Sequence, residues 1–341
     1  MSVANLSIVS TGLVTSVGFT AAASCAAIRA KVSNPTQTHF KSNGSEPIMG
    51  HQVFLDRAWT GRLKLAKMAA LAIEDCLVNI PRGKWPQIPA FICVAERDRP
   101  GRFVGLDDHL LHEIEAALDI NLSEQSIVIP HGRTSFGIAL VWARTLLEEK
   151  TVPAVLVAAA DSLLAWPTLK AYLPMDRLLT KENSNGFMPG EGATAVLLDA
   201  NADDERLRVI GLGYGMEPAA IGTELPLRAD GLTTAIKNAL TDAECELHEL
   251  DFRITDLSGE QYYFKEAALA LGRIVRVHKE EFDVWHPAEC IGEVGAVAGL
   301  AALVLADSAC RKGYAPGLGI LCHAAIDSGE RAAAVLRYGS G

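Results

Sequence analysis

Residues 127–149, with the sequence IVIPHGRTSFGIALVWARTLLEE, constrain the fold of this chain more than any other segment. A short β-branched apolar run stops at a glycine-containing turn and continues at once as an apolar helix. The pattern predicts a buried strand, a tight turn and a buried helix. The first turn of such a helix gathers free backbone N–H groups and the positive end of the helix dipole, which favours a nucleophile that carries negative charge.

The residues at this turn do not suit a nucleophile. The turn consists of His131, Gly132, Arg133, Thr134 and Ser135. A cation at the start of a helix is repelled by the positive end of the helix dipole. An enzyme would be expected to place Cys or Ser at the turn. Ser135 or Thr134 could serve as a weaker nucleophile with His131 as its base, but neighbours along the chain need not bring their side chains together.

The rest of the chain alternates buried strands with helices, and it does so twice, with one very apolar helix in each half. This indicates a layered α/β architecture, which we divide into residues 1–203 and 204–341. Residues 33–60 read as a polar, irregular excursion. Strands are predicted at 6–18, 88–96, 152–163, 186–200, 206–215, 252–260, 317–325 and 332–339, and helices at 22–30, 63–77, 105–120, 232–247, 262–273 and 289–313.

Composition narrows the function classes. The chain of 341 residues is 49% hydrophobic and carries a formal charge of −10, which argues against a nucleic-acid or anionic-membrane surface. The longest apolar run, residues 296–306, is too short to cross a bilayer. No Lys or Arg precedes Arg29, so the start lacks the charged region of a signal peptide. We expect a cytoplasmic protein.

Nothing in the sequence predicts a metal or a cofactor. The seven cysteines form no CxxC motif and no Cys/His cluster, and we interpret them as buried free thiols. Gly190 and Gly192 belong to neither a GxGxxG nor a GKS/T phosphate loop. The histidines at 109, 112, 248, 278, 286 and 323 show no ligand spacing and are expected to be structural or at the surface.

Four segments resemble the β-ketoacyl synthase branch of the thiolase-fold superfamily. Residues 180–199, TKENSNGFMPGEGATAVLLD, are similar to the family's Gly-Phe-x-x-Gly-Glu-Gly-Ala signature, and residues 10–18 to its opening strand and turn. Residues 231–252 and 291–306 are similar to the segments around its two catalytic histidines. The resemblance implies a thiolase-like five-layer α-β-α-β-α fold with two pseudo-equivalent halves, and a homodimer formed through the N-terminal half.

The resemblance also implies a reaction, in which a Cys takes an acyl group from a carrier protein and two histidines assist decarboxylation and condensation. Carried over residue by residue, the nucleophile position falls at Arg133, the first histidine at Ser258 and the second at Glu293. No cysteine lies between Cys93 and Cys245. A guanidinium cannot attack a thioester, and a carboxylate cannot donate the hydrogen bond of a neutral imidazole. The family mechanism should therefore be absent.

Two classes of function follow. The first is a non-condensing homologue that acts as a binding or scaffold protein, either a chain-length-factor-like partner of a ketosynthase or an adaptor for a client such as a type VI secretion effector. The second is an acyltransferase of the 3-oxoacyl-[acyl-carrier-protein] synthase class with an altered site, in which Ser258, Glu260 and Glu293 could supply acid/base groups. His131, Thr134, Ser135 and Glu260 are the candidate binding residues.

The partner would be a second copy, a related subunit, a protein client or an acyl-carrier protein. We expect residues 126–130 to pair across the two-fold axis of a dimer. A buried charge without a partner is costly, so Arg133 should bond a carboxylate, with Glu293 as the first choice and Glu260 as the second.

Overall fold

The computed structural model describes residues 6–42, 46–201 and 205–339. The strands are β1 (Leu6–Val14), β2 (Thr36–Lys41), β3 (Pro47–Gly50), β4 (Ala90–Cys93), β5 (Ile127–Ile129), β6 (Val155–Ser162), β7 (Glu191–Asp199), β8 (Leu207–Met216), β9 (Phe252–Thr255), β10 (Val284–Trp285), β11 (Gly319–Ala325) and β12 (Glu330–Tyr338). The helices are α1 (Ala21–Arg29), α2 (Gly61–Cys76), α3 (Leu106–Leu118), α4 (Ser135–Glu148), α5 (Trp166–Tyr172), α6 (Asp230–Asp242), α7 (Gln261–Ile274), α8 (Ala288–Ile291) and α9 (Val297–Arg311). Short 3-10 helices lie at Arg82–Gln87, Gly132–Thr134, Leu173–Met175 and Leu247–Glu249.

One ten-stranded sheet runs through the molecule in the order β10-β9-β11-β12-β8-β1-β7-β6-β4-β5, and β2 and β3 form a separate hairpin. The order is β1-β7-β6-β4-β5 in the N-terminal half and β8-β12-β11-β9-β10 in the C-terminal half. When the five strands of each half are numbered along the chain, both halves have the same order, 1-5-4-2-3. The directions also agree, because β4 is parallel to β5 and β6 just as β9 is parallel to β10 and β11. The halves are joined where Leu6 pairs with Val209 and Ser7 with Arg208.

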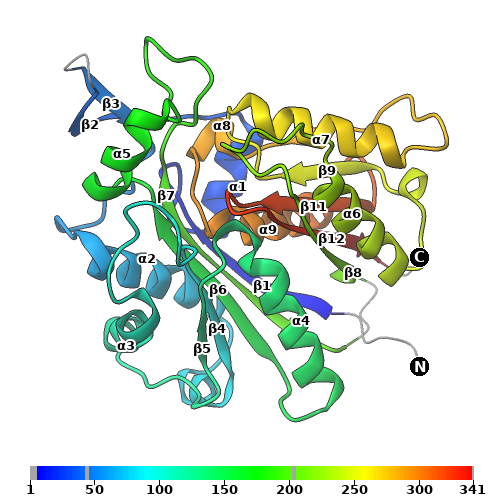
Figure 1. Cartoon of the computed structure of the whole chain (residues 1–341). Coiled ribbons are helices and arrows are strands. Elements are labelled where there is room, and N and C mark those ends of the chain that lie inside the picture. Colours follow the sequence, from blue (N-terminus) through cyan, green and yellow to red (C-terminus); the bar gives the residue numbers. More distant parts are fainter. Residues whose placement is uncertain (1–5, 43–45, 202–204, 340–341) are drawn as a thin grey trace.

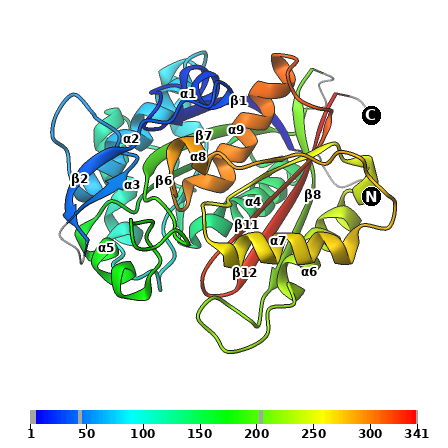
Figure 2. The same ribbon diagram turned by 90° about the horizontal axis from the view of Figure 1, so that it is seen from above.

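Helices cover both faces of each half. Helices α2 and α3 lie outside the N-terminal half and α6 and α7 outside the C-terminal half, while α4 and α9 lie between the two halves of the sheet (Figure 1). Helix α1 packs against α9 (Figure 2). The result is the predicted α-β-α-β-α order of five layers. Among the described residues, no helix is both long enough and apolar enough to span a membrane.

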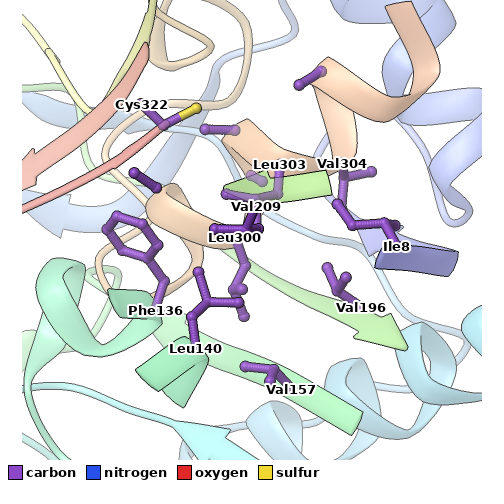
Figure 3. Close-up of a cluster of buried hydrophobic side chains, with 14 of the residues drawn as sticks. Ile8, Phe136, Leu140, Val157, Val196, Val209, Leu300, Leu303, Val304 and Cys322 are labelled. Carbon is purple, nitrogen blue, oxygen red and sulfur yellow. The ribbon is translucent and has the colours of Figure 1, made fainter. Parts of the chain in front are cut away.

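The inner layer forms the largest core cluster. Leu300 and Leu303 of α9 are fully buried and belong to the same cluster as Ile8 of β1 and Val209 of β8 (Figure 3). Helix α4 crosses α9 closely, because a Cβ on Gly299 would lie 2.3 Å from the Phe136 ring. Burial on nearly every side explains why α9 has almost no polar face. Helix α4 is buried on one side and exposes Val141 and Trp142 on the other.

Glycines bring an outer helix close to the first strand of each half. A Cβ on Gly12 of β1 would lie 1.9 Å from the carbonyl oxygen of Ala72 in α2. A Cβ on Gly213 of β8 would lie 2.1 Å from the carbonyl oxygen of Ala235 in α6. Any side chain at either strand position would push the helix away from the sheet.

Some sequence predictions were wrong. Residues 33–60 are not wholly irregular, because they contain the β2–β3 hairpin. The helix predicted at 289–313 is broken into α8 and α9, with Gly292 and Gly295 between them at φ values of 73° and 55°. The strands predicted at 6–18 and 252–260 end earlier, at Val14 and Thr255.

The short helix α5 was not predicted at all. The boundary predicted between residues 203 and 204 lies outside the described residues, so that division stays a prediction.

Candidate functional site

The carboxyl ends of strands from both halves lie near the N-terminal ends of the inner helices α4 and α9. Open α/β sheets bind ligands at the carboxyl ends of their strands. Glu96 follows β4, and Arg133 follows β5 at the turn into α4. Asp161 lies near the end of β6. In the other half, Asp256 follows β9 and Asp327 lies just after β11. We call this group and the side chains that contact it the central charged cluster.

Arg133 is 8% exposed and lies among carboxylates of the C-terminal half. Its Nη1 atom is 3.2 Å from Glu293 Oε2 and 3.6 Å from Asp256 Oδ2, and its Nη2 atom is 3.5 Å from Asp327 Oδ1. The guanidinium carbon lies 4.6 Å from the centre of the Tyr263 ring. Burial alone would lower the pKa of Arg133, but the surrounding groups, Glu293 foremost, raise it well above its usual value.

Glu293 is held from three directions. Besides its contact with Arg133, it accepts hydrogen bonds from Ser258 Oγ at 2.6 Å and from the Gly295 backbone N–H at 2.9 Å. The structure therefore brings Arg133, Ser258 and Glu293 into one network, and the predicted contact between Arg133 and Glu293 is confirmed. Glu293 also lies just before α9, where the helix dipole favours an anion.

The second choice for a partner of Arg133 was wrong, because Glu260 pairs with Arg177. The Nε and Nη2 atoms of Arg177 face the two carboxylate oxygens of Glu260, with Nη2 at 2.9 Å from Oε2. This fork-to-fork geometry matches a planar guanidinium better than one end-on contact would. Arg177 also lies 3.0 Å from Asp327 through Nη1, so Asp327 bridges Arg177 and Arg133.

Asp327 receives more donors than any other carboxylate of the cluster. The hydroxyls of Tyr172 and Tyr263 both donate to it, in addition to the two arginines. Burial would raise the pKa of Asp327, but the hydrogen bonds and charge of Arg177, followed by the charge of Arg133, lower it to about 2. Asp327 is therefore ionised at neutral pH.

A third arginine completes the cluster. The guanidinium of Arg99 forms two parallel hydrogen bonds of 2.6 Å to Asp161, which also accepts the backbone N–H of Ala296 at 2.8 Å. Burial raises the pKa of the nearby Glu96 and raises that of Asp256 to about 6. The carboxylates outnumber the arginines, so the raised pKa values limit the negative charge that is buried here.

The cluster encloses very little free space. A cavity of about 20 Å³ is lined by the three arginines together with Glu96, Glu260, Glu293 and Asp327. This volume holds one water molecule. The side chains therefore fill the place where the carboxyl ends of the strands meet.

The other predicted residues at the turn lie in a separate hydrogen-bond group. The Nδ1 atom of His131 is 3.0 Å from Glu330 Oε2, and Thr134 Oγ1 donates to the same oxygen at 3.2 Å. Ser135 Oγ accepts the His131 backbone N–H at 3.0 Å and donates to the Ile129 carbonyl at 3.1 Å. The hydroxyls of Thr134 and Ser135 are thus engaged with other groups, and neither pairs with the His131 ring as a nucleophile would with its base.

The cysteines do not supply a nucleophile in place of Arg133. Burial raises the pKa of every cysteine thiol in the chain, to about 11 for Cys25 and about 12 for Cys76, so none is a ready thiolate. Within residues 6–42, 46–201 and 205–339, no group of three or more His, Cys, Asp or Glu side chains is arranged to hold a metal ion.

Several members of the cluster were missed by sequence reasoning. Asp256 stands two residues before Ser258, so its position carried a signal. Asp327 lies in the turn between β11 and β12. Arg99 and Arg177 lie in loops with no recognisable motif. Their roles depend on which loops the fold brings together.

Comparison with known proteins identifies the fold. No family model and no curated protein matches the sequence. Solved structures do match. A chain of the ishigamide ketosynthase/chain length factor superposes with a TM-score of 0.78 and is 15% identical, covering 98% of this chain and 99% of that one.

Two further structures give the same result. The ketosynthase ApeO in complex with its chain length factor ApeC, from Xenorhabdus doucetiae, gives a TM-score of 0.76 at 11% identity, with 98% of both chains covered. AntDE:AntF, a type II polyketide synthase acyl-carrier protein in complex with its ketosynthase, gives 0.78 at 16% identity, covering 98% of this chain and 99% of that one. At these identities the likeness concerns architecture, and the chain has the thiolase-like fold of ketosynthases and chain length factors.

Proposed function

We propose that this chain is a non-condensing protein on a ketosynthase fold, which acts as a binding or scaffold subunit. One observation carries the proposal: the turn into α4, where the resembled family places its nucleophile, holds Arg133, and carboxylates of the opposite half keep that side chain in place. A guanidinium has no lone pair available for attack on a thioester and does not lose its proton at neutral pH.

The surroundings of Arg133 support the same proposal. Condensation needs room for an acyl chain and a malonyl unit beside the turn, whereas the cavity there has about 20 Å³. It also needs groups that donate hydrogen bonds to a developing enolate. The second histidine position holds Glu293, whose two oxygens already accept hydrogen bonds from Ser258 and Gly295.

The surface offers a place for a partner subunit. Strand β5 lies at the end of the sheet, and in the described part of the chain only β4 pairs with it. Trp142 of α4 is 45% exposed and contacts Phe91 of β4 edge to face. We propose that β5 pairs with a second copy or with a related ketosynthase-like subunit, which would satisfy the free backbone groups of this edge. The named complexes of ketosynthases with chain length factors and a carrier protein make such partners reasonable.

Acylation tests the chemical part of the proposal. The protein is incubated with radiolabelled acyl-carrier protein or acyl-CoA, and a condensing ketosynthase serves as positive control. We expect covalent label on the control and none on this chain. Stoichiometric label on this chain would overturn the proposal, and peptide mapping would then identify the new nucleophile.

Light scattering tests the assembly. At about 10 µM, a concentration at which a stable dimer is populated, we expect twice the chain mass of 36.4 kDa. Val128→Pro should weaken the dimer because proline removes a backbone donor from β5. Val284→Pro changes β10 at the opposite end of the sheet and is the matched control. A monomeric wild type would contradict the homodimer and direct attention to a heteromeric partner or a protein client.

A further inference from the structure

A second cavity, of about 200 Å³, lies away from the central charged cluster and shares no lining residue with it. It lies where the end of α1 meets β10, α8 and α9, and Figure 2 shows α1 beside α9. We call it the α1–α9 pocket. Its lining includes Ile28, Arg29, Trp285, Leu305 and Tyr314.

Two stacked aromatic rings line one side of the pocket. The rings of Trp285 and Tyr314 lie within 17° of parallel, with their centroids 6.2 Å apart. Phe252 of β9 contacts Trp285 at a centroid distance of 4.7 Å, and this buried neighbour fixes the indole ring. Leu305 and Ile28 add aliphatic surface. Aromatic and aliphatic side chains in this arrangement favour an aromatic ligand, which can pack against the exposed parts of the rings edge to face or with an offset.

The pocket also has a cation that is free to bind an anion. The guanidinium of Arg29 lies 4.1 Å from the centre of the Tyr314 ring, and no described carboxylate lies within 4.0 Å of it. Glu289, the acidic neighbour, is already paired, because Lys31 Nζ and His286 Nε2 lie 2.8 Å and 2.6 Å from its oxygens. An incoming carboxylate would therefore meet Arg29 without competing with Glu289.

Size and charge together define the ligand. We propose that the α1–α9 pocket binds a small organic anion with a flat ring, an aryl carboxylate of the size of 3-phenylpropionate. The ring lies against Trp285 and Tyr314, and the carboxylate accepts hydrogen bonds from Arg29. A closed apolar cavity of about 150 Å³ holds one benzene molecule, so the volume here suffices for a ring with a short side chain. This site is independent of the role of Arg133.

Calorimetric titration of the full chain with 3-phenylpropionate tests the proposal. We expect saturable one-to-one binding below about 10 mM, the range of a ligand with so few atoms. Arg29→Gln should weaken binding about five- to tenfold because a charge-assisted hydrogen bond is lost. Lys67→Gln is the matched control, since Lys67 lies over the ring of Trp59 at 5.2 Å and does not line the pocket, and it should leave the affinity unchanged.

Two further measurements separate the ring from the charge. The uncharged 3-phenylpropionamide should bind about five- to tenfold more weakly than the acid, and Arg29→Gln should not weaken it further. Octanoate, which has the charge without the ring, should bind more weakly to the wild type, and Tyr314→Leu should abolish the preference for the ring. Absence of saturable binding, equal affinity of Arg29→Gln and wild type, or equal affinity for octanoate would each overturn the proposal.

Discussion

The two halves of the molecule share a strand order but differ in the turn that leads into the inner helix. In the N-terminal half, this turn carries the cation Arg133 before α4, and in the C-terminal half it carries the anion Glu293 before α9. The two side chains meet at 3.2 Å. The turns before the two inner helices therefore carry opposite charges, and their side chains form a buried ionic contact where the halves meet.

The outer parts of the halves are alike by comparison. In both, a glycine of the first strand lets the outer helix lie directly on the sheet, Gly12 under α2 and Gly213 under α6. The halves thus share this contact between strand and outer helix, whereas the turns before α4 and α9, at the carboxyl ends of the strands where function is usually located, carry opposite charges.

The largest expected effect comes from breaking the contact between the halves. Arg133→Met leaves Glu293, Asp256 and Asp327 without their shared cation, and we expect a loss of about 3–5 kcal/mol in the free energy of unfolding. Glu293→Gln should also destabilise the fold. The double variant should lose less than the sum of the two single losses, because the contact they share is counted once. Urea unfolding measures all three.

An exposed pair is the control for this prediction. Arg97 lies 3.3 Å from Asp107 and its side chain is 72% exposed. Arg97→Met should cost less than about 1 kcal/mol. If Arg133→Met costs no more than Arg97→Met, the contact between the halves is not a significant source of stability.

A smaller effect tests whether the outer layers are equivalent. Gly12→Ala and Gly213→Ala should each destabilise by about 1–3 kcal/mol, because the added methyl group meets a helix carbonyl in either half. Thermal unfolding of the two variants should show similar losses. A loss in one half alone would show that the outer layers are not equivalent.

Gly272 of α7 is the control for crowding. A Cβ there meets no atom within 4 Å, so Gly272→Ala should stabilise the protein by about 0.5–1 kcal/mol through helix propensity. If Gly272→Ala destabilises the protein, the losses seen for Gly12→Ala and Gly213→Ala cannot be assigned to the clash between strand and outer helix.

The pH dependence separates two acidic groups of the C-terminal half. The pKa of Asp327 is lowered from 3.8 to about 2, so its ionised form stabilises the fold above pH 4 and this stability is lost as the pH falls toward 2. We expect Asp327→Asn to be about 2 kcal/mol less stable than wild type at pH 7, with the difference shrinking at acid pH. A difference that does not change with pH would contradict the assignment.

Asp256 should act in the opposite direction. Burial raises its pKa from 3.8 to about 6, so its ionisation opposes folding as the pH rises through that range. Asp256→Asn should remove this decline, which unfolding curves recorded from pH 4 to pH 7 can show.

Local pattern was enough to predict most of the fold. The apolar runs of β6, β7 and α9 are compatible with few other secondary structures. The turn at Arg133 could be predicted because a strand, a glycine and a helix follow one another directly. The contact with Glu293 could be predicted because the resemblance placed both residues in one site. The hairpin β2–β3 was not predicted because both strands are short and β2 is largely polar, and α5 was not predicted because it has only seven residues.

The rest of the cluster depends on tertiary structure. Arg177 and Asp327 are separated by 150 positions in the chain, and neither lies in a repeating pattern. The pairing of Glu260 with Arg177, and not with Arg133, depends on how the loops meet in the folded chain. The break between α8 and α9 was not predicted because Gly292 and Gly295 stand in a run that is apolar apart from Glu293.

The strand order has a consequence for synthesis on the ribosome. Strand β1 pairs along most of its length with β7, where Leu13 faces Thr194 roughly 180 residues later. At translation rates of about 5–20 residues per second, this gap corresponds to about 10–40 s. During that interval β1 has no partner strand and the apolar face of α2 has no sheet to pack against. The nascent chain therefore exposes an apolar surface to which chaperones can bind until its middle third has emerged.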